Sequence, residues 1–524
     1  QIKMPLHHDA AALEQKIRKR LGLSGGQELR YRIIRKSIDA RKKPELSLVY
    51  SVEVSASGEE KIIKRANDPN VTIVKQTGYH LPGAVSPTPS IPPVIVGAGP
   101  AGLFCAYALT MSGCAPVVLE RGRSVTERTK DVERFWESGV LDTVSNVQFG
   151  EGGAGTFSDG KLNTGVNNPR NYWVLEQFAD AGAGAEILFD AKPHIGTDVL
   201  VNVVQNLREE ILALGGEVRF GAKLTDIMLQ DGAVCGVRYE NQAGKQTLAC
   251  SHLVLAPGHS ARDTFRMLDR LGVPMQPKAF SMGVRIEHLQ KTINEAQYGA
   301  FADNPALGAA DYKLNVKLPD GTSAYTFCMC PGGYVVAAAS EEGGVVTNGM
   351  SNCARDGENA NAALLVTLTP EDFPDKSTLG GVLYQQQLER AAFEAGGRTY
   401  HAPAQLVGDF LAHRPSTAFG SVKPTYRPGV TLCELHDVLP ARITSVLEQA
   451  LPALDKRLHG FAGPDAVMTA PETRSSSPVR FVRGENRQSE IAGLYPCGEG
   501  AGYAGGIMSA AVDGILTAEA ILNA

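Results

Sequence analysis

The stretch from Val94 to Gly122 reads VIVGAGPAGLFCAYALTMSGCAPVVLERG, and it decides the fold. Its β-branched run, Val94 to Val96, predicts a buried parallel strand, while Leu103 to Met111 has the length and the Ala/Leu content of a helix. Between them lie three glycines in GxGxxG spacing, as in a tight turn from strand to helix. We therefore expect the first unit of an α/β domain of the Rossmann type here.

Each glycine has a physical role in such a turn. Gly97 permits the tight turn, Gly99 lets the backbone approach a pyrophosphate, and Gly102 lets the helix pack closely on the strand. The positive end of the helix then faces the phosphates. We assign to a dinucleotide cofactor the whole run Gly97, Ala98, Gly99, Pro100, Ala101 and Gly102. A glycine-rich turn without a ligand is the alternative.

An acid ends the stretch. A second strand, Pro116 to Leu119, delivers Glu120, a little beyond the roughly 20 residues after which dinucleotide-binding turns place an acceptor for a ribose hydroxyl. A carboxylate at this place disfavours a 2′-phosphate, so NADP is not expected at this site. We assign the neighbouring Arg121 to the cofactor as well.

Size and charge narrow the class of protein. The chain has 524 residues, enough for two or three domains, and its formal net charge of −5 argues against a nucleic-acid partner. No apolar run reaches the roughly 18 residues that span a membrane. Histidines and charges stand near the N-terminus where a secretory signal has an apolar core. We expect a cytoplasmic protein with neither a membrane nor a nucleic-acid partner.

The nine cysteines are odd in number and scattered, as expected for reduced thiols. Only Cys328 and Cys330, in CMCPGG, are close neighbours. This pair lacks the second pair of ligands that a zinc site needs, so no metal is predicted. Strand alternation would point both thiols to one face simply as packing, and whether they are redox-active stays open.

The N-terminal region predicts a small α+β domain over residues 1–85. A helix is expected over residues 9–22, and two strands follow, joined by the basic turn RKKPE at residues 41–45. A proline-rich linker then runs to residue 93. The basic turn is a possible docking point for a protein partner, although a charge run is usually a solvated face.

Two further regions complete the architecture. Residues 94–275 and 469–524 predict the Rossmann-type dinucleotide-binding domain, in which LVLAPG, ending at Gly258, is a return strand. Residues 276–468 are rich in β patterns and predict an inserted substrate domain that covers the cofactor. The segment QFGEGGAGTFSDGKLNTG, residues 148–165, contains so many small residues that we expect it against the cofactor; a flexible loop is the alternative.

These elements together resemble a known family. The glycines with Glu120, the LVLAPG strand and the terminal GLYPCGEGAGYAGGIMSAAVDG resemble the FAD-binding domain of the glutathione-reductase-like flavoproteins. The chain from about residue 30 onward more closely resembles the uncharacterised bacterial FAD-dependent dehydrogenases. The segments that carry this resemblance are IDARKK, QFGEGGAGTFSDGKL, FSMGVRIEH, CMCPGGYV and ETRSSSPVR.

The resemblance implies FAD and roles for individual residues. Glu120 takes the adenosine ribose, Lys223 and Leu224 lie beside the adenine, and Glu499 takes the ribityl chain, where most of the superfamily has an aspartate. We add to the cofactor set the glycine-loop and terminal residues Gly153, Gly258, Gly498, Gly505, Gly506 and Ile507. A helix that starts near Gly506 can stabilise the negative charge of reduced flavin with its N-terminal N–H groups; an ordinary docking helix is the alternative.

Three residues are candidates for catalysis. Lys161 follows the glycine loop and can bind an acidic group or tune the flavin, although an exposed loop lysine is the commoner case. Glu472 and Arg474 concentrate polar groups just before the last flavin segment, where a surface ion pair is the alternative. Arg285 and Glu287 lie two apart on a strand and are expected to form a structural pair.

We conclude from the sequence that the protein is an FAD-dependent oxidoreductase, which exchanges a hydride between its bound flavin and a small-molecule substrate. The chain has no second nucleotide fingerprint, so NAD(P)H, if it is the transient reductant, enters the substrate pocket. Cys497 has no CxxC partner, which disfavours disulfide reductase chemistry of the glutathione-reductase kind. A flavin-binding regulatory protein that docks a partner through residues 1–85, or an enzyme that modifies a macromolecule, are the alternatives.

Overall fold

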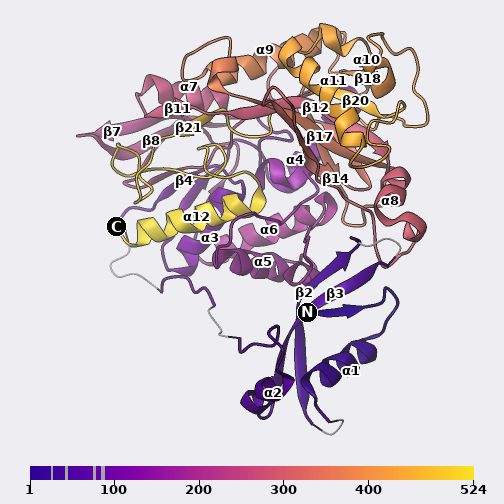
Figure 1. The fold of residues 1–524 in the computed structure, drawn as a ribbon. Helices are drawn as coiled ribbons and strands as arrows, with labels where there is room; N and C mark the ends of the chain where they lie inside the picture. The colour runs from indigo at the N-terminus through magenta and orange to yellow at the C-terminus, as the bar shows by residue number, and fades with distance from the viewer. Residues whose placement is uncertain (25–26, 42–44, 75–77, 84–88) are drawn as a thin grey trace.

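The structure is a computed structural model that describes residues 1–24, 27–41, 45–74, 78–83 and 89–524. Figure 1 shows a small N-terminal unit at one end, a central unit that contains both α3 and the C-terminal helix α12, and a third unit at the other end. The expected domain boundary at residue 85 and residues 42–44 of the basic turn lie outside the described residues.

The N-terminal unit is an antiparallel three-stranded sheet with two helices. The strand order is β1–β3–β2, with β1 (Ile2–Met4), β2 (Leu29–Asp39), β3 (Ser47–Ala56), α1 (Ala10–Leu21) and α2 (Glu59–Ala66). Helix α1 begins where Asp9 accepts a hydrogen bond from the Ala12 N–H, and it ends at Gly22 with φ +62°. Strand β2 docks on the central unit, because the Lys36 N–H donates to the Phe189 carbonyl at 2.7 Å.

The central unit is built on a parallel sheet of five short strands. In sheet order these are β22 (Leu494–Pro496), β10 (Leu253–Leu255), β4 (Val94–Val96), β5 (Val117–Leu119) and β6 (Glu217–Arg219). Every residue of β4, β5, β10 and β22 is buried, as expected for strands covered on both faces. The predicted α/β fold is therefore confirmed.

Different layers cover the two faces of this sheet. Four helices pack on one face, namely α3 (Pro100–Met111), α5 (Arg170–Asp180), α6 (Thr197–Ala213) and α12 (Ile507–Leu522). On the other face lie α7 (Arg262–Arg270) and the antiparallel strands β7 (Lys223–Gln230), β8 (Ala233–Asn241) and β9 (Gly244–Ala249). Because β22 pairs with β10 and α12 packs on α3, the last part of the chain completes the domain that begins at Val94 (Figure 1).

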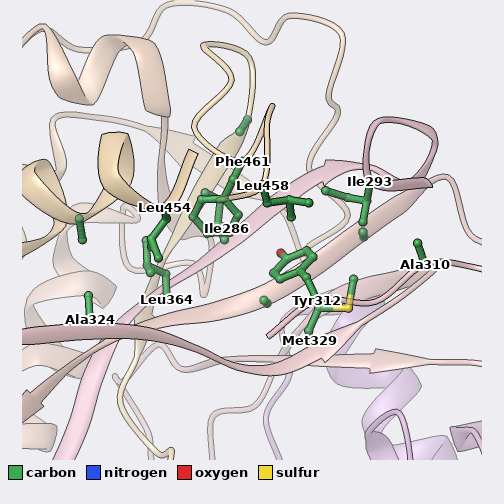
Figure 2. Packing of buried hydrophobic residues seen from close by; sticks show 14 of the residues in the cluster. Ile286, Ile293, Ala310, Tyr312, Ala324, Met329, Leu364, Leu454, Leu458 and Phe461 are labelled. Atoms are coloured by element: carbon green, nitrogen blue, oxygen red, sulfur yellow. The ribbon is translucent and has the colours of Figure 1, made fainter. Parts of the chain in front are cut away.

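The inserted region forms a seven-stranded, mostly antiparallel sheet. Its order is β13 (Asn315–Lys317), β14 (Ser323–Cys330), β17 (Asn359–Leu368), β12 (Phe280–Leu289), β20 (Val467–Glu472), β18 (Ala402–Leu406) and β19 (Val430–Leu432). Side chains such as Ile286, Leu364, Leu454 and Phe461 pack together between this sheet and α11 (Ala441–Asp455) (Figure 2). The expected domain boundary between residues 468 and 469 falls inside β20.

The remaining elements join the units. Strands β11 (Met275–Pro277) and β21 (Val479–Phe481) pair with each other at the two points where the chain passes between the central unit and the insert. The other strands and α-helices are β15 (Gly333–Ala337), β16 (Thr347–Ser351), α4 (Val125–Ser138), α8 (Gln290–Tyr298), α9 (Gly380–Ala395) and α10 (Val407–Leu411). In the part of the chain that the structure describes, no helix has the length and hydropathy to cross a bilayer.

Candidate active site

A cavity of about 850 Å³ lies between the carboxyl ends of the parallel strands and the insert. Gly97 and Gly99 line it from the first glycine-rich segment, and Gly505 and Gly506 line it from the last. Open α/β sheets bind their ligands at the carboxyl ends of their strands, so the cavity lies where the fold places a cofactor. The two segments, distant in sequence, share one site.

Two glycines of the first segment have no room for a side chain. At Gly97, where φ is +102°, an added Cβ would lie 2.2 Å from the Ala256 carbonyl oxygen, and at Gly102 it would lie 1.9 Å from the Gly97 carbonyl oxygen. Gly99, Pro100 and Ala101 line the cavity at the start of α3, whereas Ala98 and Gly102 do not. Gly102 thus has the packing role that the sequence predicts.

Glu120 lies at the end of β5 and lines the cavity. Its carboxylate accepts hydrogen bonds from the N–H groups of Ala98 at 2.8 Å, Gly122 at 2.8 Å and Gly150 at 3.0 Å. A carboxylate has about four lone-pair sites, so one acceptor site is left for a ribose hydroxyl. The three backbone contacts, which the sequence did not predict, fix the side chain in place.

The residues predicted around the adenine take different positions. Leu224 lines the cavity, whereas Lys223 is absent from its wall and pairs with Asp263 at 2.7 Å. Arg121 lines the cavity, donates twice to Asp263 and lies over the Phe149 ring at 4.4 Å. The adenine contacts of Lys223 and Leu224 stay predictions.

The glycine segment at residues 148–165 lies against the cavity, with Gly153 next to Gly99. Arg128, a fully buried residue of α4, holds the start of this segment by donating to the carbonyls of Asn146, Val147 and Glu151. A buried guanidinium with several carbonyl acceptors fixes the loop. The sequence gave no signal for Arg128, because its partners are carbonyls rather than side chains.

The last segment completes the opposite wall. Gly258, Gly505 and Gly506 border the cavity, and an added Cβ at any of them would meet no atom of the described residues within 4 Å, so their bare backbone leaves open space. Ile507 begins α12, whose N-terminus faces the cavity as the start of α3 does. Gly498 is not in the wall; its N–H donates to Asp513 Oδ2 at 2.7 Å.

Two titratable side chains of this wall are close together. Glu499 Oε1 lies 3.6 Å from His259 Nε2, and burial raises the pKa of Glu499 to about 7. Burial, together with the charges of Arg474 and Arg262, lowers the pKa of His259 to about 3, so its imidazole is neutral. His259 Nδ1 is buried with no hydrogen-bond partner among the described residues. An unpaired buried nitrogen beside bare glycines fits a polar ring ligand. His259 directly follows a predicted strand end, a signal that the sequence analysis missed.

Lys161 is not an exposed loop lysine. Its Nζ is buried in the cavity wall and lies 2.9 Å from Asp159 Oδ2. Burial disfavours the charged form, but Cys330 and Asp159 outweigh it and raise the pKa of Lys161. Arg355 also pairs with Asp159, so two cations surround one carboxylate.

Glu472 is buried in the cavity wall, and its carboxylate pairs with Arg285 of the neighbouring strand β12. Arg285 donates to its two oxygens at 2.9 and 3.1 Å. Burial raises the pKa of Glu472 although Arg285 opposes this. The expected pair of Arg285 with Glu287 is wrong, because Glu287 accepts from Asn359 and Thr425 instead. The pattern i, i+2 correctly placed both residues on one strand but could not show the neighbouring strand.

Arg474 forms a buried ion pair rather than a surface one. It donates to both oxygens of Glu389 at 3.0 and 2.9 Å, and Arg262 donates to the same two oxygens at 2.8 Å each. Arg474 borders the cavity, and its contacts with Glu389 hold α9 against the wall, while its Nη1 donates to the hydroxyls of Ser260 and Ser340. Its catalytic role, like those of Lys161 and Glu472, stays a prediction.

A group outside the cavity has the ligand set of a metal site. Nitrogens of His413 and His436 and a carboxylate oxygen of Glu448 lie within 4.8 Å of one another in the insert. His436 Nδ1 also lies 2.6 Å from Glu434. His436 already has a carboxylate at each nitrogen, so hydrogen bonds alone account for the group.

Comparisons with known proteins agree with this site. Family models match at residues 91–296 (FAD binding domain), 279–475 (FAD-dependent protein, C-terminal domain-like) and 1–55 (a domain of unknown function). An uncharacterised protein of Clostridium beijerinckii is 48% identical over 528 residues, covering 100% of this chain and 98% of that protein. The two FAD matches show that FAD is the cofactor.

Solved structures are more distant. A flavin-dependent brominase has 13% identity, covers 83% of this chain and 80% of its own, and has a TM-score of 0.37. The E. coli quinol fumarate reductase has 12% identity, 83% and 70% coverage and a TM-score of 0.37. A geranylgeranyl bacteriochlorophyll reductase-like protein of Thermoplasma acidophilum has 10% identity, 83% and 78% coverage and a TM-score of 0.36. Likenesses this weak say nothing about the chemistry of this chain.

Proposed function

The chain belongs to one family with the uncharacterised protein of Clostridium beijerinckii, and we propose that it exchanges a hydride between bound FAD and a small organic substrate. It is a flavin-dependent oxidoreductase. The observation that carries the finer proposal is the single cavity, which both glycine-rich segments and the insert line together. A cofactor held there has the substrate domain as its opposite wall.

Different residues of the chain would bind the different parts of the cofactor. Gly97 and Gly99 with the start of α3 would hold the diphosphate, and the free acceptor site of Glu120 would take a ribose hydroxyl. The start of α12 would face the flavin ring, where its N–H groups stabilise negative charge. FAD itself supplies the hydride chemistry, and the protein supplies position and electrostatics.

The wall on the substrate side contains side chains that buried ion pairs fix in place and side chains that can bind substrate or exchange a proton. Glu472 and Arg474 are fixed by Arg285 and Glu389, so we assign them to shaping the wall and excluding water. Lys161 offers an ammonium that can bind an acidic group of the substrate. The Glu499 carboxyl, with its pKa raised to about 7, can hold or release a proton near neutral pH.

The proposal includes the partners of the reaction. NAD(P)H would enter this cavity as a transient reductant, since the sequence has one nucleotide fingerprint. We place the protein in the cytoplasm, because its nine cysteines are unpaired, as is usual there. A regulatory protein that docks a partner through residues 1–85 is the second candidate, favoured by the separate N-terminal unit in Figure 1.

Anaerobic titration tests the proposal. The purified yellow protein should lose its flavin absorbance on addition of NADH, NADPH or a reduced organic substrate, and regain it with an oxidised one. Replacement of Lys161 by Gln should raise KM for acidic substrates, while Lys317→Gln, on β13 and not among the residues that line the cavity, should not. A flavin that no organic donor reduces would refute hydride exchange, and unchanged flavin binding would then favour the regulatory candidate.

A further inference from the structure

We propose that Cys328 and Cys330 form a reversible disulfide at the cavity wall, with Cys328 as the thiol that attacks low-molecular-weight disulfides. Cys328 lines the cavity, whereas Cys330 is fully buried behind it. This redox site is separate from hydride exchange and does not depend on it.

The backbone brings the two thiols together. In a regular strand, residues i and i+2 lie about 6.6 Å apart, near the upper limit of about 6.8 Å for the Cα atoms of a disulfide. Strand β14 is not regular here, because its register against β17 shifts between Phe327 and Cys330, and Cys328 has φ +43°. The Cys330 thiol turns back and donates to the Cys328 carbonyl at 3.2 Å. When Cys328 is a thiolate, the same S–H can donate to the Cys328 sulfur instead.

The surrounding charges favour a thiolate. Lys161 and Arg355 pair with the single carboxylate of Asp159, which leaves one positive charge beside the thiols when no acidic ligand is bound. Arg285 donates to the Cys328 carbonyl at 2.8 Å, while Glu472 balances its charge. A thiolate is the species that attacks disulfides, and cationic surroundings stabilise it.

The two thiols differ in a way that assigns their roles. The hydrogen bond from Cys330 and the charges of Lys161 and Arg285 lower the pKa of Cys328 despite its burial. The same hydrogen bond, with burial, raises the pKa of Cys330. Cys328 is therefore the attacking thiolate and Cys330 the resolving thiol. Burial first, and then neighbouring acids or thiols, raise the pKa of Cys105, Cys250 and Cys497, so no such role falls to them.

The exchange balances in two steps. The Cys328 thiolate attacks a disulfide RSSR, forming a mixed disulfide and releasing RS⁻. The released RS⁻ takes the proton of Cys330, and Cys330 attacks Cys328 Sγ, which forms the Cys328–Cys330 bond and releases the second RS⁻. Both cysteines are oxidised by one electron each, and RSSR is reduced to RSH and RS⁻.

The experiment uses the full-length holoprotein in buffers of reduced and oxidised glutathione. After acid quench and alkylation, the peptide that contains both cysteines should be doubly alkylated when most of the glutathione is reduced. As the share of oxidised glutathione rises, this peptide should become unalkylated, with a mass two hydrogen atoms below that of the reduced peptide. Cys330→Ser should instead accumulate a glutathione adduct on Cys328, and Cys328→Ser should accumulate none. Cys235→Ser, on β8, should behave as wild type.

A second measurement tests the electrostatic step. Lys161→Gln should shift the pH profile of Cys328 alkylation upward, slowing it at neutral pH by about tenfold for one pKa unit. Retained flavin absorbance verifies that each variant is folded. Two alkylated cysteines at every glutathione ratio in the wild type, or a Cys330→Ser protein without adduct, would overturn the proposal whatever the flavin chemistry proves to be.

Discussion

The two walls of the cavity are built in opposite ways. The wall around Gly97 and Glu120 comes mainly from one continuous stretch, and backbone N–H groups of Ala98, Gly122 and Gly150 satisfy its acid. The wall on the insert side comes from several segments, and its charges satisfy one another across long separations, as Arg285 and Glu472 do over 187 residues. A cofactor site can be local in sequence, whereas the wall that faces the substrate is assembled only by the tertiary fold.

This difference predicts where substitutions cost most. Backbone partners cannot be removed by substitution, but each buried ion pair depends on two side chains. The insert wall should therefore be more sensitive in stability, and the cofactor wall more sensitive in FAD affinity.

The largest effect is expected at Glu389, which two buried guanidiniums share. Glu389→Gln leaves the charges of Arg262 and Arg474 undercompensated, since Glu341 pairs closely with Arg262 alone. We expect a loss of about 3–5 kcal/mol in the free energy of unfolding, the usual cost of breaking a buried pair. Urea denaturation of the holoprotein measures it.

The same helix offers a matched control. Glu394, also on α9, pairs with Arg398 at the surface, where both side chains are well exposed. Glu394→Gln should cost no more than about 1 kcal/mol. Equal losses in the two variants would mean that the insert wall does not depend on its buried charges.

The next effect is expected at Gly97. An alanine there combines a left-handed φ with a Cβ only 2.2 Å from a carbonyl oxygen, so the turn must move away from the cofactor. We expect FAD affinity to fall by a hundredfold or more, about 3 kcal/mol. Fluorescence titration of the apoprotein with FAD measures this.

Gly272→Ala is the control that separates backbone strain from the steric clash expected in Gly97→Ala. This glycine has φ +71° and no atom within 4 Å of an added Cβ. The variant should lose about 1–2 kcal/mol of stability from its left-handed backbone and keep its FAD affinity. If Gly97→Ala also kept FAD, the close approach at this turn would have no role in binding.

The same contrast explains what the sequence could predict. The strand at Val94, the turn and the helix after it are fixed by neighbours in the chain, and their periodicity shows them directly. The terminal helix was also predicted, because an alanine-rich run follows the double glycine near the end of the sequence. Arg128, His259 and Glu389 escaped prediction, since their environments arise from residues far away in sequence.

Boundaries were harder to predict than elements for a related reason. The insert expected at 276–468 ends in the middle of β20, because this strand pairs with β12 and β18. A strand that belongs to one sheet and leads into the next domain has no change of composition at its middle. The pairing that decides its domain is visible only in three dimensions.

The smallest effect is expected at Glu499 in the cavity, with Glu287 in the insert as its control. Burial raises the pKa of each of these two acids to about 7. A ribityl hydroxyl that donates to Glu499 favours its carboxylate form. FAD affinity should therefore rise with pH between about 6 and 8, by up to tenfold for a shift of about one pKa unit. Glu499→Gln should abolish this rise, and Glu287→Gln, outside the cavity wall, should leave it unchanged.

Both acids should change the free energy of unfolding with pH in the same direction. Each folded-state pKa is raised above the ordinary value of 4.5, so the folded apoprotein binds more protons than the unfolded chain between pH 4.5 and about 7. The free energy of unfolding therefore falls as pH rises through this window. Each Glu→Gln variant lacks that loss and should gain relative to wild type from pH 5 to pH 7.5. Saturation with FAD should reduce this gain for Glu499→Gln and leave it unchanged for Glu287→Gln. An equal response of both variants to FAD would mean that Glu499 does not contact the cofactor.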